Sequence, residues 1–309
     1  MYFVIPITLV SAVVALIGNI LVVIVIMRRE PLRSQSAYKF ITSLAIADIL
    51  VSSVAQPLYV SVLMSGSGSY CWLERVSHFF GSLASSASAL GLLIVSIDRY
   101  IFITKPLHYH FLMTPFRVWF ALIYIWVSAV LISLLPYMAG KKAFHIVVFS
   151  ATILDHFVTG VCYLTIYRVV TMKVSDDLIN NQNKSHRQRQ ATRTVAFVLL
   201  AMVICWMPYI TASFVWGINI EKWAPDSAMI SVYFWLLALG HWNSSVNVMI
   251  YSWKNTELRS SLKSFLGIRS QENENLSSNN HNNSNQNQIA PQKAINQSRP
   301  ETLTVESLV

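Results

Sequence analysis

Charged side chains are scarce in this sequence. Only 12% of the 309 residues are Asp, Glu, Lys or Arg, whereas 54% are hydrophobic. A soluble domain carries about 25% charged residues, so this shortage argues against a chain built of soluble globular domains. Acids are rarer still inside the long apolar stretches, which contain only Asp48 and Asp155. The scarcity of charge therefore indicates a chain that is largely surrounded by lipid.

Cysteine pairs, strand patterns and catalytic clusters are missing as well. Two of the three cysteines, Cys162 and Cys205, fall inside apolar stretches, and Cys71 has no evident partner, so no disulfide framework is expected. Strand-like alternation is absent, which argues against a membrane β-barrel. The sequence shows no histidine cluster, no Ser/His/Asp arrangement and no paired carboxylates, so we do not expect an enzyme. Repeated halves and broken helices, which are typical of transporters, are not visible either.

Seven long apolar stretches stand out instead. A helix needs roughly 20 apolar residues to cross a bilayer, and each stretch reaches that length. The stretches are Tyr2–Met27, Phe40–Met64, Val76–Ile97, Val118–Gly140, Ile146–Tyr167, Thr194–Ile220 and Ser227–Trp253. The first is interpreted as a helix and not as a signal peptide, because no basic region precedes it and two arginines follow it. The predicted fold class is all-α, a seven-transmembrane helix bundle.

Lysine and arginine are unevenly divided between the two ends of these stretches. If the N-terminus lies outside, the outer connections hold only Arg75, Lys141, Lys142 and Lys222, and most other basic residues are cytoplasmic. Inner loops of membrane proteins carry this excess, so we expect the N-terminus outside and the C-terminus in the cytoplasm. The net charge of +9 is then mainly a topology signal with some attraction to anionic lipid, and nucleic-acid binding is not needed to explain it.

Two segments follow the seventh stretch. Residues 254–268 place Leu258 and Leu262 at helical spacing beside basic residues, which predicts a short amphipathic eighth helix on the inner membrane face. Residues 269–309 are rich in Asn, Gln and Ser and are expected to form a disordered cytoplasmic tail. The transmembrane domain is therefore expected over residues 1–268. Within it, the polar and basic segment Met172–Arg193 is predicted to be the longest loop.

Polar motifs inside the apolar stretches occur in a fixed order, each on its own stretch. Polar groups at membrane depth are costly and usually functional. The motifs are Gly18-Asn19, Leu44–Asp48, Asp98-Arg99-Tyr100, Trp126, Cys205–Pro208 and Asn247–Tyr251. Together they resemble the rhodopsin-like (class A) G-protein-coupled receptors, over about residues 3–268. The segments around Asp98 and Lys105–His110 look most like the melanocortin, cannabinoid and adenosine receptor cluster. A short second outer loop without cysteine and a fifth helix without proline resemble melanocortin receptors in particular.

The resemblance implies a plasma-membrane receptor that binds an extracellular ligand, whether small molecule, lipid or peptide, and activates a heterotrimeric G protein. Arrestin is a further implied partner. The residues that it assigns to G-protein coupling and the activation switch are Asp98, Arg99, Tyr100, Leu107, Tyr167, Trp206, Pro208, Asn247 and Tyr251. The alternatives are an ordinary ion pair at Asp98 and Arg99, a proline kink beside a core tryptophan, and simple packing of Tyr167.

The sequence departs from the family pattern at two positions of the activation switch. Asp98 is expected to hold Arg99 in the resting state, but Gln188 stands where the family often adds a second acid. Resting activity is therefore expected to be raised. Val248 stands where the family has proline, so a straighter seventh helix is expected.

Candidate ligand-pocket residues lie toward the outer ends of the helices. They are Glu74, His78, Asp155, His156, Tyr209 and His241. His241 stands where opsins carry the retinal lysine, which excludes a covalent retinal Schiff base, and Gly81 stands where amine receptors carry aspartate. A conventional amine receptor is therefore not expected. Melanocortin receptors carry three acids near the outer ends of the second and third helices. Glu74 matches one of them, whereas Leu58 and His78 occupy the other two positions. Asp155 either binds a cationic ligand or pairs with His156 or another polar neighbour.

A sodium ion is the one cofactor that the resemblance implies. The corresponding residues are Asp48, Ser88, Asn243, Ser244 and Asn247. All five supply oxygen atoms, which suit a hard cation. The alternative is that these groups bond only to each other and to water. At the other extreme of the chain, the terminal residues Glu306–Val309 resemble the ligand of a PDZ domain, which binds a C-terminal peptide as an added strand.

Overall fold

The computed structural model describes residues 3–65, 71–176, 182–219, 227–254 and 256–267, apart from the side chains of 71, 170–176, 182–199, 227, 251–254 and 256–257. All regular elements in these ranges are helical. They are α1 (Val4–Arg28), α2 (Glu30–Arg33), α3 (Ser36–Leu50), the π-helical η1 (Val51–Ala55), α4 (Gln56–Ser65), α5 (Cys71–Thr104), the 3₁₀ turn η2 (Pro106–His108), α6 (Tyr109–Leu112), α7 (Pro115–Met138), α8 (Gly140–Asp176), α9 (Gln182–Ile218), α10 (Ser227–Lys254) and α11 (Thr256–Phe265). The chain divides into two units after Leu262. The predicted tail and the terminal PDZ motif lie outside the described residues.

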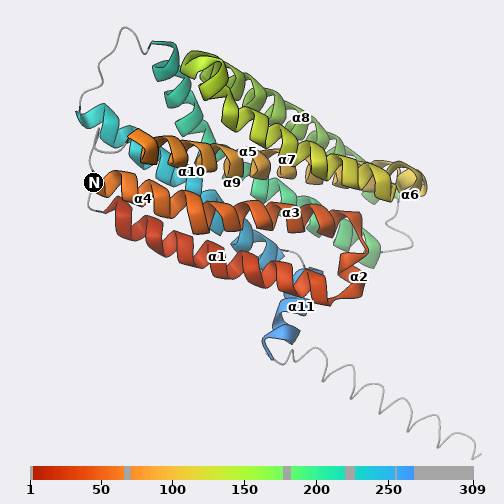
Figure 1. Ribbon diagram of the computed structural model, residues 1–309. Coiled ribbons are helices and arrows are strands. Elements are labelled where there is room, and N and C mark those ends of the chain that lie inside the picture. Colours follow the sequence, from red (N-terminus) through yellow and green to blue (C-terminus); the bar gives the residue numbers. More distant parts are fainter. Residues whose placement is uncertain (1–2, 66–70, 177–181, 220–226, 255, 268–309) are drawn as a thin grey trace, which may run out of the picture. The chain divides into compact units, whose positions relative to one another are not determined.

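The predicted seven-helix bundle is confirmed. Its members are α1, the continuous run α3–η1–α4, α5, α7, α8, α9 and α10; Figure 1 shows α3 and α4 in line with each other beside α1. In the part of the chain that the structure describes, six helices have both the length and the apolar composition to cross a membrane. The seventh, α10, is long enough, but it carries a run of polar residues, His241, Asn243, Ser244 and Asn247, that face the protein interior.

Several helices extend beyond the predicted apolar stretches. The largest difference concerns Met172–Arg193, which was predicted as a loop. The structure continues α8 to Asp176 and begins α9 at Gln182, so that prediction was wrong. The segment contains neither proline nor glycine, and lysine, arginine and glutamine are good helix formers. Membrane thickness limits the apolar stretch but does not end the helix.

A π-helical segment that the sequence analysis did not anticipate interrupts the second membrane crossing. The backbone N–H of Gln56 bonds to the carbonyl of Val51 and not to the residue four positions back. Pro57 follows immediately, and proline cannot donate to the carbonyl four residues before it. The wider turn accommodates this loss, as π-bulges in helices commonly do. It also brings the amide of Gln56 into the interior, where that side chain is fully buried.

The connection between α7 and α8 is a single residue, Ala139. Gly140, which begins α8, has a φ of 85°. This left-handed conformation is costly for residues with a Cβ atom, so glycine suits the reversal. The very short connection that the sequence predicted here is confirmed.

The distribution of side chains is that of a protein in lipid. Large apolar residues such as Phe120, Phe157 and Leu164 are more than half exposed on the outside of the bundle. Polar residues such as Asp48 and Gln56, by contrast, have no exposed surface. In water this arrangement would leave extensive apolar area exposed, whereas in a bilayer the same area contacts lipid chains.

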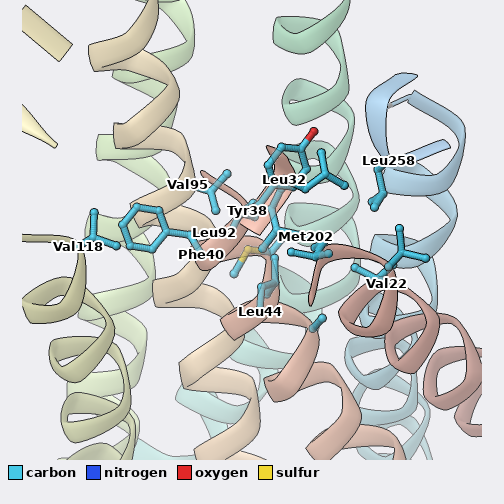
Figure 2. Close-up of a cluster of buried hydrophobic side chains, with 14 of the residues drawn as sticks. Val22, Leu32, Tyr38, Phe40, Leu44, Leu92, Val95, Val118, Met202 and Leu258 are labelled. Carbon is cyan, nitrogen blue, oxygen red and sulfur yellow. The ribbon is translucent and has the colours of Figure 1, made fainter. Parts of the chain in front are cut away.

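Buried apolar side chains gather toward the Arg28 end of α1. There a cluster of buried side chains joins α1, α2, α3, α5, α7, α9 and the first turns of α11 (Figure 2). Its central members include Val22, Phe40, Leu44, Leu92 and Met202. Leu258 from α11 is fully buried in it, and Leu262 packs against it. The amphipathic helix predicted over residues 254–268 is thus present as Thr256–Phe265, and its apolar face packs on the bundle.

Gly18→Ala is expected to destabilise the protein by about 1–3 kcal/mol, because the added methyl group overpacks the interface between α1 and α10. A Cβ atom at Gly18 would overlap the side chain of Val248. The melting temperature of the purified protein in detergent measures the effect. Gly160→Ala is the matched control, because nothing lies within 4 Å of the Cβ position there. Adding Val248→Ala should restore the lost stability; a double variant as unstable as Gly18→Ala would contradict this account.

Candidate functional site

A charged cluster occupies the C-terminal part of α5, and we call Asp98, Arg99 and Tyr109 the Arg99 cluster. The Asp98 carboxylate is fully buried, and its Oδ2 accepts hydrogen bonds from Arg99 Nε at 3.0 Å and Nη2 at 2.8 Å. The Tyr109 hydroxyl donates to Oδ1 of the same carboxylate at 2.8 Å. Asp98 is therefore held from both sides. Burial, and then the neighbouring Asp98 carboxylate, raise the pKa of the Tyr109 phenol, so it stays a donor at neutral pH.

The other residues predicted for coupling at this end of the chain's helices lie on several elements. Leu107, in the short η2 turn after α5, is 86% exposed. Tyr100 is half-buried on α5, and Tyr167 on α8 is exposed. Tyr251 lies on α10 and Gln188 on α9, but both side chains lie outside the described residues. The contact of Tyr109 with Asp98 was missed in the sequence, because the pair is 11 residues apart across an irregular turn.

A buried polar network surrounds Asp48 in the middle of the bundle, and we call it the Asp48 network. Ser244 and Ser88 donate to Asp48 Oδ1 at 2.8 Å and 3.4 Å, and Asn247 Nδ2 donates to Oδ2 at 3.0 Å. The contacts join α3, α5 and α10. Four of the five residues predicted to hold sodium are thus brought together. The structure shows no bond between Asp48 and the fifth, Asn243, which is buried on the same face of α10.

Two buried side-chain oxygen atoms of α10 lack hydrogen-bond partners among the described residues. Oδ1 of Asn243 and Oδ1 of Asn247 are buried, and neither has a hydrogen-bond partner among the described residues. An unpaired buried carbonyl oxygen costs free energy unless a water molecule or a cation completes it. The donor set of one carboxylate, two hydroxyls and two amide oxygens fits a hard monovalent cation.

Trp206 lines the wall of a central cavity in the bundle. It is buried on α9, and its ring contacts Tyr209 and His241 edge-on. Gly240 lets the ring approach α10, because a Cβ atom there would lie 2.9 Å from it. Pro208 lies inside α9 two residues after Trp206. The ring is therefore enclosed by two helices and by residues that line a cavity.

This central cavity has a volume of about 140 Å³ and lies between α5, α8, α9 and α10. Of the predicted ligand-pocket residues, His78, Asp155, Tyr209 and His241 line it. Gly81 lines it too, with nothing within 4 Å of its Cβ position.

The two remaining candidates lie elsewhere. Glu74 lines a second cavity of about 640 Å³, which it shares with His78, Lys141 and His145. His156 lines neither cavity; its Nδ1 lies 2.7 Å from the carbonyl oxygen of Thr152.

Sequence reasoning also missed a polar stripe on α5. Ser82, Ser85 and Ser86 face the central cavity together with His78 and Gly81. These positions follow the three- and four-residue spacing of one helix face. A polar face on a membrane helix was a signal available in the sequence. Ser213 and His145 also line the cavity, and Ser213 Oγ lies 3.0 Å from His145 Nδ1 in a hydrogen bond.

Comparison with known proteins gives consistent matches. Residues 18–146 and 141–251 match the family described as 7 transmembrane receptor (rhodopsin family). The octopamine receptor beta-1R of Drosophila melanogaster is 27% identical over 307 residues, which cover 82% of this chain and 59% of that protein. The human histamine H2 receptor is 30% identical over 287 residues, covering 82% of this chain and 77% of that receptor. The alpha-1A adrenergic receptor of Oryzias latipes is 26% identical over 308 residues, covering 82% and 64%.

Proposed function

We propose, because the chain belongs to the 7 transmembrane receptor (rhodopsin) family, that it is a cell-surface receptor which activates a heterotrimeric G protein. A ligand in the central cavity would shift the bundle between two states, and the Arg99 end would engage the G protein. The observation that carries this proposal is the Arg99 cluster, a buried carboxylate that restrains an arginine at the end of a membrane helix. The N-terminus would be outside and the C-terminus in the cytoplasm of the plasma membrane.

The central cavity supports the proposal that the ligand is a small molecule. Three of the similar receptors are named for octopamine, histamine and adrenergic ligands. The site differs from the conventional amine site that the resemblance describes, since Gly81 leaves open space at the position of its aspartate. His241 provides no amine for a retinal Schiff base, so the chain is not an opsin. Little supports a melanocortin-like site beyond Glu74 and the short connection at Ala139.

The Asp48 network would hold a sodium ion when one is bound. Asp48, Ser88, Asn243, Ser244 and Asn247 would supply the oxygen atoms, and the ion would add a positive charge that offsets the buried carboxylate. By occupying the space between α3, α5 and α10, it would favour the resting state. Arrestin and a PDZ protein at the C-terminus remain proposed partners.

Leu107 provides a test of the G-protein interface. It is the most exposed apolar side chain in the loop beside the Arg99 cluster, so it is available to insert into an apolar cleft on the G protein. Membranes that contain the receptor should accelerate uptake of a GTP analogue by added heterotrimeric G proteins relative to receptor-free membranes. Leu107→Asp should weaken this exchange at least several-fold and leave surface expression unchanged.

Leu107→Met is the matched control, because it keeps an apolar side chain of similar volume. Normal exchange by Leu107→Asp would make Leu107 a membrane contact only. Exchange no faster than in receptor-free membranes, across all G-protein classes, would argue against the proposed function itself.

A further inference from the structure

The carboxylate of Asp155 lacks the partner that a charge at membrane depth requires. Asp155 lies in the middle of α8 and is only 9% exposed. Its Oδ1 is buried and has no hydrogen-bond partner among the described residues. Burial of an ionised carboxylate without a partner is strongly unfavourable, and such groups in membrane proteins usually serve a function.

His156 does not satisfy this carboxylate. Its Nδ1 is 3.6 Å from Asp155 Oδ2, which is too far for a good hydrogen bond. The same nitrogen lies 2.7 Å from the carbonyl oxygen of Thr152, so its proton already has an acceptor in the preceding helical turn. The pairing of Asp155 with its neighbour, one of the two alternatives left open by the sequence, is therefore weak.

The central cavity places Asp155 where a ligand can reach it. Asp155 lines this cavity together with Thr152 one turn earlier on α8. Among the described residues that line the cavity, Asp155 is the only acid, and none is lysine or arginine. The protein itself therefore supplies no permanent positive charge to the carboxylate, and a ligand cation would complete the pair.

The remaining walls indicate the shape of such a ligand. Trp206, Tyr209 and Phe214 present aromatic surface, and Phe214 is stacked on Phe149 with ring centroids 4.1 Å apart. Aromatic faces attract cations and pack against flat apolar groups. A volume of about 140 Å³ is below the roughly 300–1,000 Å³ of pockets for drug-sized ligands, so the ligand is small.

We propose that the central cavity binds a small organic monocation with an aromatic body, and that Asp155 on α8 holds its charge. This inference rests on the proposed receptor function and names the ligand class of the same cavity. In conventional amine sites the carboxylate lies at the position of Gly81 on α5. Here Asp155 provides the carboxylate from a different helix, α8.

A thermal-shift experiment on the purified full-length receptor tests the assignment. Three matched sets of compounds are used: small arylalkylamines such as phenethylamine, the corresponding arylalkanols, and the corresponding arylalkanoic acids. At least one amine should raise Tm by several degrees, while its alcohol and acid counterparts should not. Asp155→Asn, which keeps the shape and removes the charge, should abolish that shift. Thr159→Val is the control, because Thr159 is buried one turn further along α8, its hydroxyl has no hydrogen-bond partner among the described residues, and it does not line the cavity.

The outcomes separate the two proposals. Three results would overturn the cation assignment. The alcohols or acids could raise Tm as much as the amines do, the shift in Tm could survive Asp155→Asn, or no amine could shift Tm. None of these results bears on G-protein activation, which is read from nucleotide exchange in receptor membranes. Conversely, an amine shift that depends on Asp155 supports the cation site even where nucleotide exchange fails.

Discussion

Replacing Arg99 by alanine is expected to reduce nucleotide exchange on the G protein to the level of receptor-free membranes. Arg99 is the only guanidinium in the Arg99 cluster, and its side chain is about one-fifth exposed while its partner Asp98 is fully buried. Release from Asp98 would leave a planar, permanently charged group free to contact the G protein. The measurement is resting uptake of a GTP analogue by added G proteins, which the raised resting activity expected from Gln188 makes accessible.

Two controls make this result specific. Arg99→Lys keeps the charge but loses the two-pronged contact with Asp98 Oδ2, so it should retain only part of the exchange. Surface expression of both variants should remain close to wild type. Arg99→Ala leaves the Asp98 carboxylate with the Tyr109 hydroxyl as a donor, which limits the cost of removing the arginine. Undiminished exchange by a well-expressed Arg99→Ala receptor would remove Arg99 from the coupling mechanism.

The bundle was predictable because its cause is visible in the chain. Lipid demands long apolar segments, and a stretch such as Val118–Gly140 marks its helix to within a few residues of α7, Pro115–Met138. Helix ends were less predictable where nothing local stops the helix, as between Met172 and Arg193. The π-helical turn before Pro57 depends on how the bundle accommodates one missing donor, and a sequence pattern does not reveal that choice.

Some features of the candidate sites were also predictable from the sequence, and others were not. The Asp48 network could be anticipated because the resemblance to rhodopsin-like receptors assigns its members, and helical spacing places Ser244 and Asn247 on one face of α10. The bond between Tyr109 and Asp98 depends on the path of a loop, which has no periodicity. The position of Asp155 on the cavity wall, and not against His156, depends on the rotation of α8, and the sequence left that alternative open.

Sodium is expected to lower resting nucleotide exchange, and Asp48→Asn is expected to abolish that dependence. Asp48 has no exposed surface, and its three side-chain donors leave both oxygens engaged but the negative charge uncompensated. A cation bound by Asp48 and by the unpartnered oxygens of Asn243 and Asn247 would stabilise the resting arrangement of α3, α5 and α10. Activation that draws these helices together would then compete with the ion, so sodium and the active state oppose each other.

The experiment compares sodium with potassium at constant ionic strength, so that general screening of charge is the same in both. Resting exchange by the wild-type receptor should fall as sodium replaces potassium. Asp48→Asn keeps an acceptor oxygen and a similar volume but removes the charge, so its exchange should be equal in the two salts. Ser52→Ala is the matched control, because Ser52 is buried one turn further along, bonds to the backbone carbonyl of Asp48 and makes no contact with its carboxylate. A wild-type response that potassium reproduces, or a sodium response that survives in Asp48→Asn, would show that the Asp48 network satisfies its own polar groups with water and does not bind sodium.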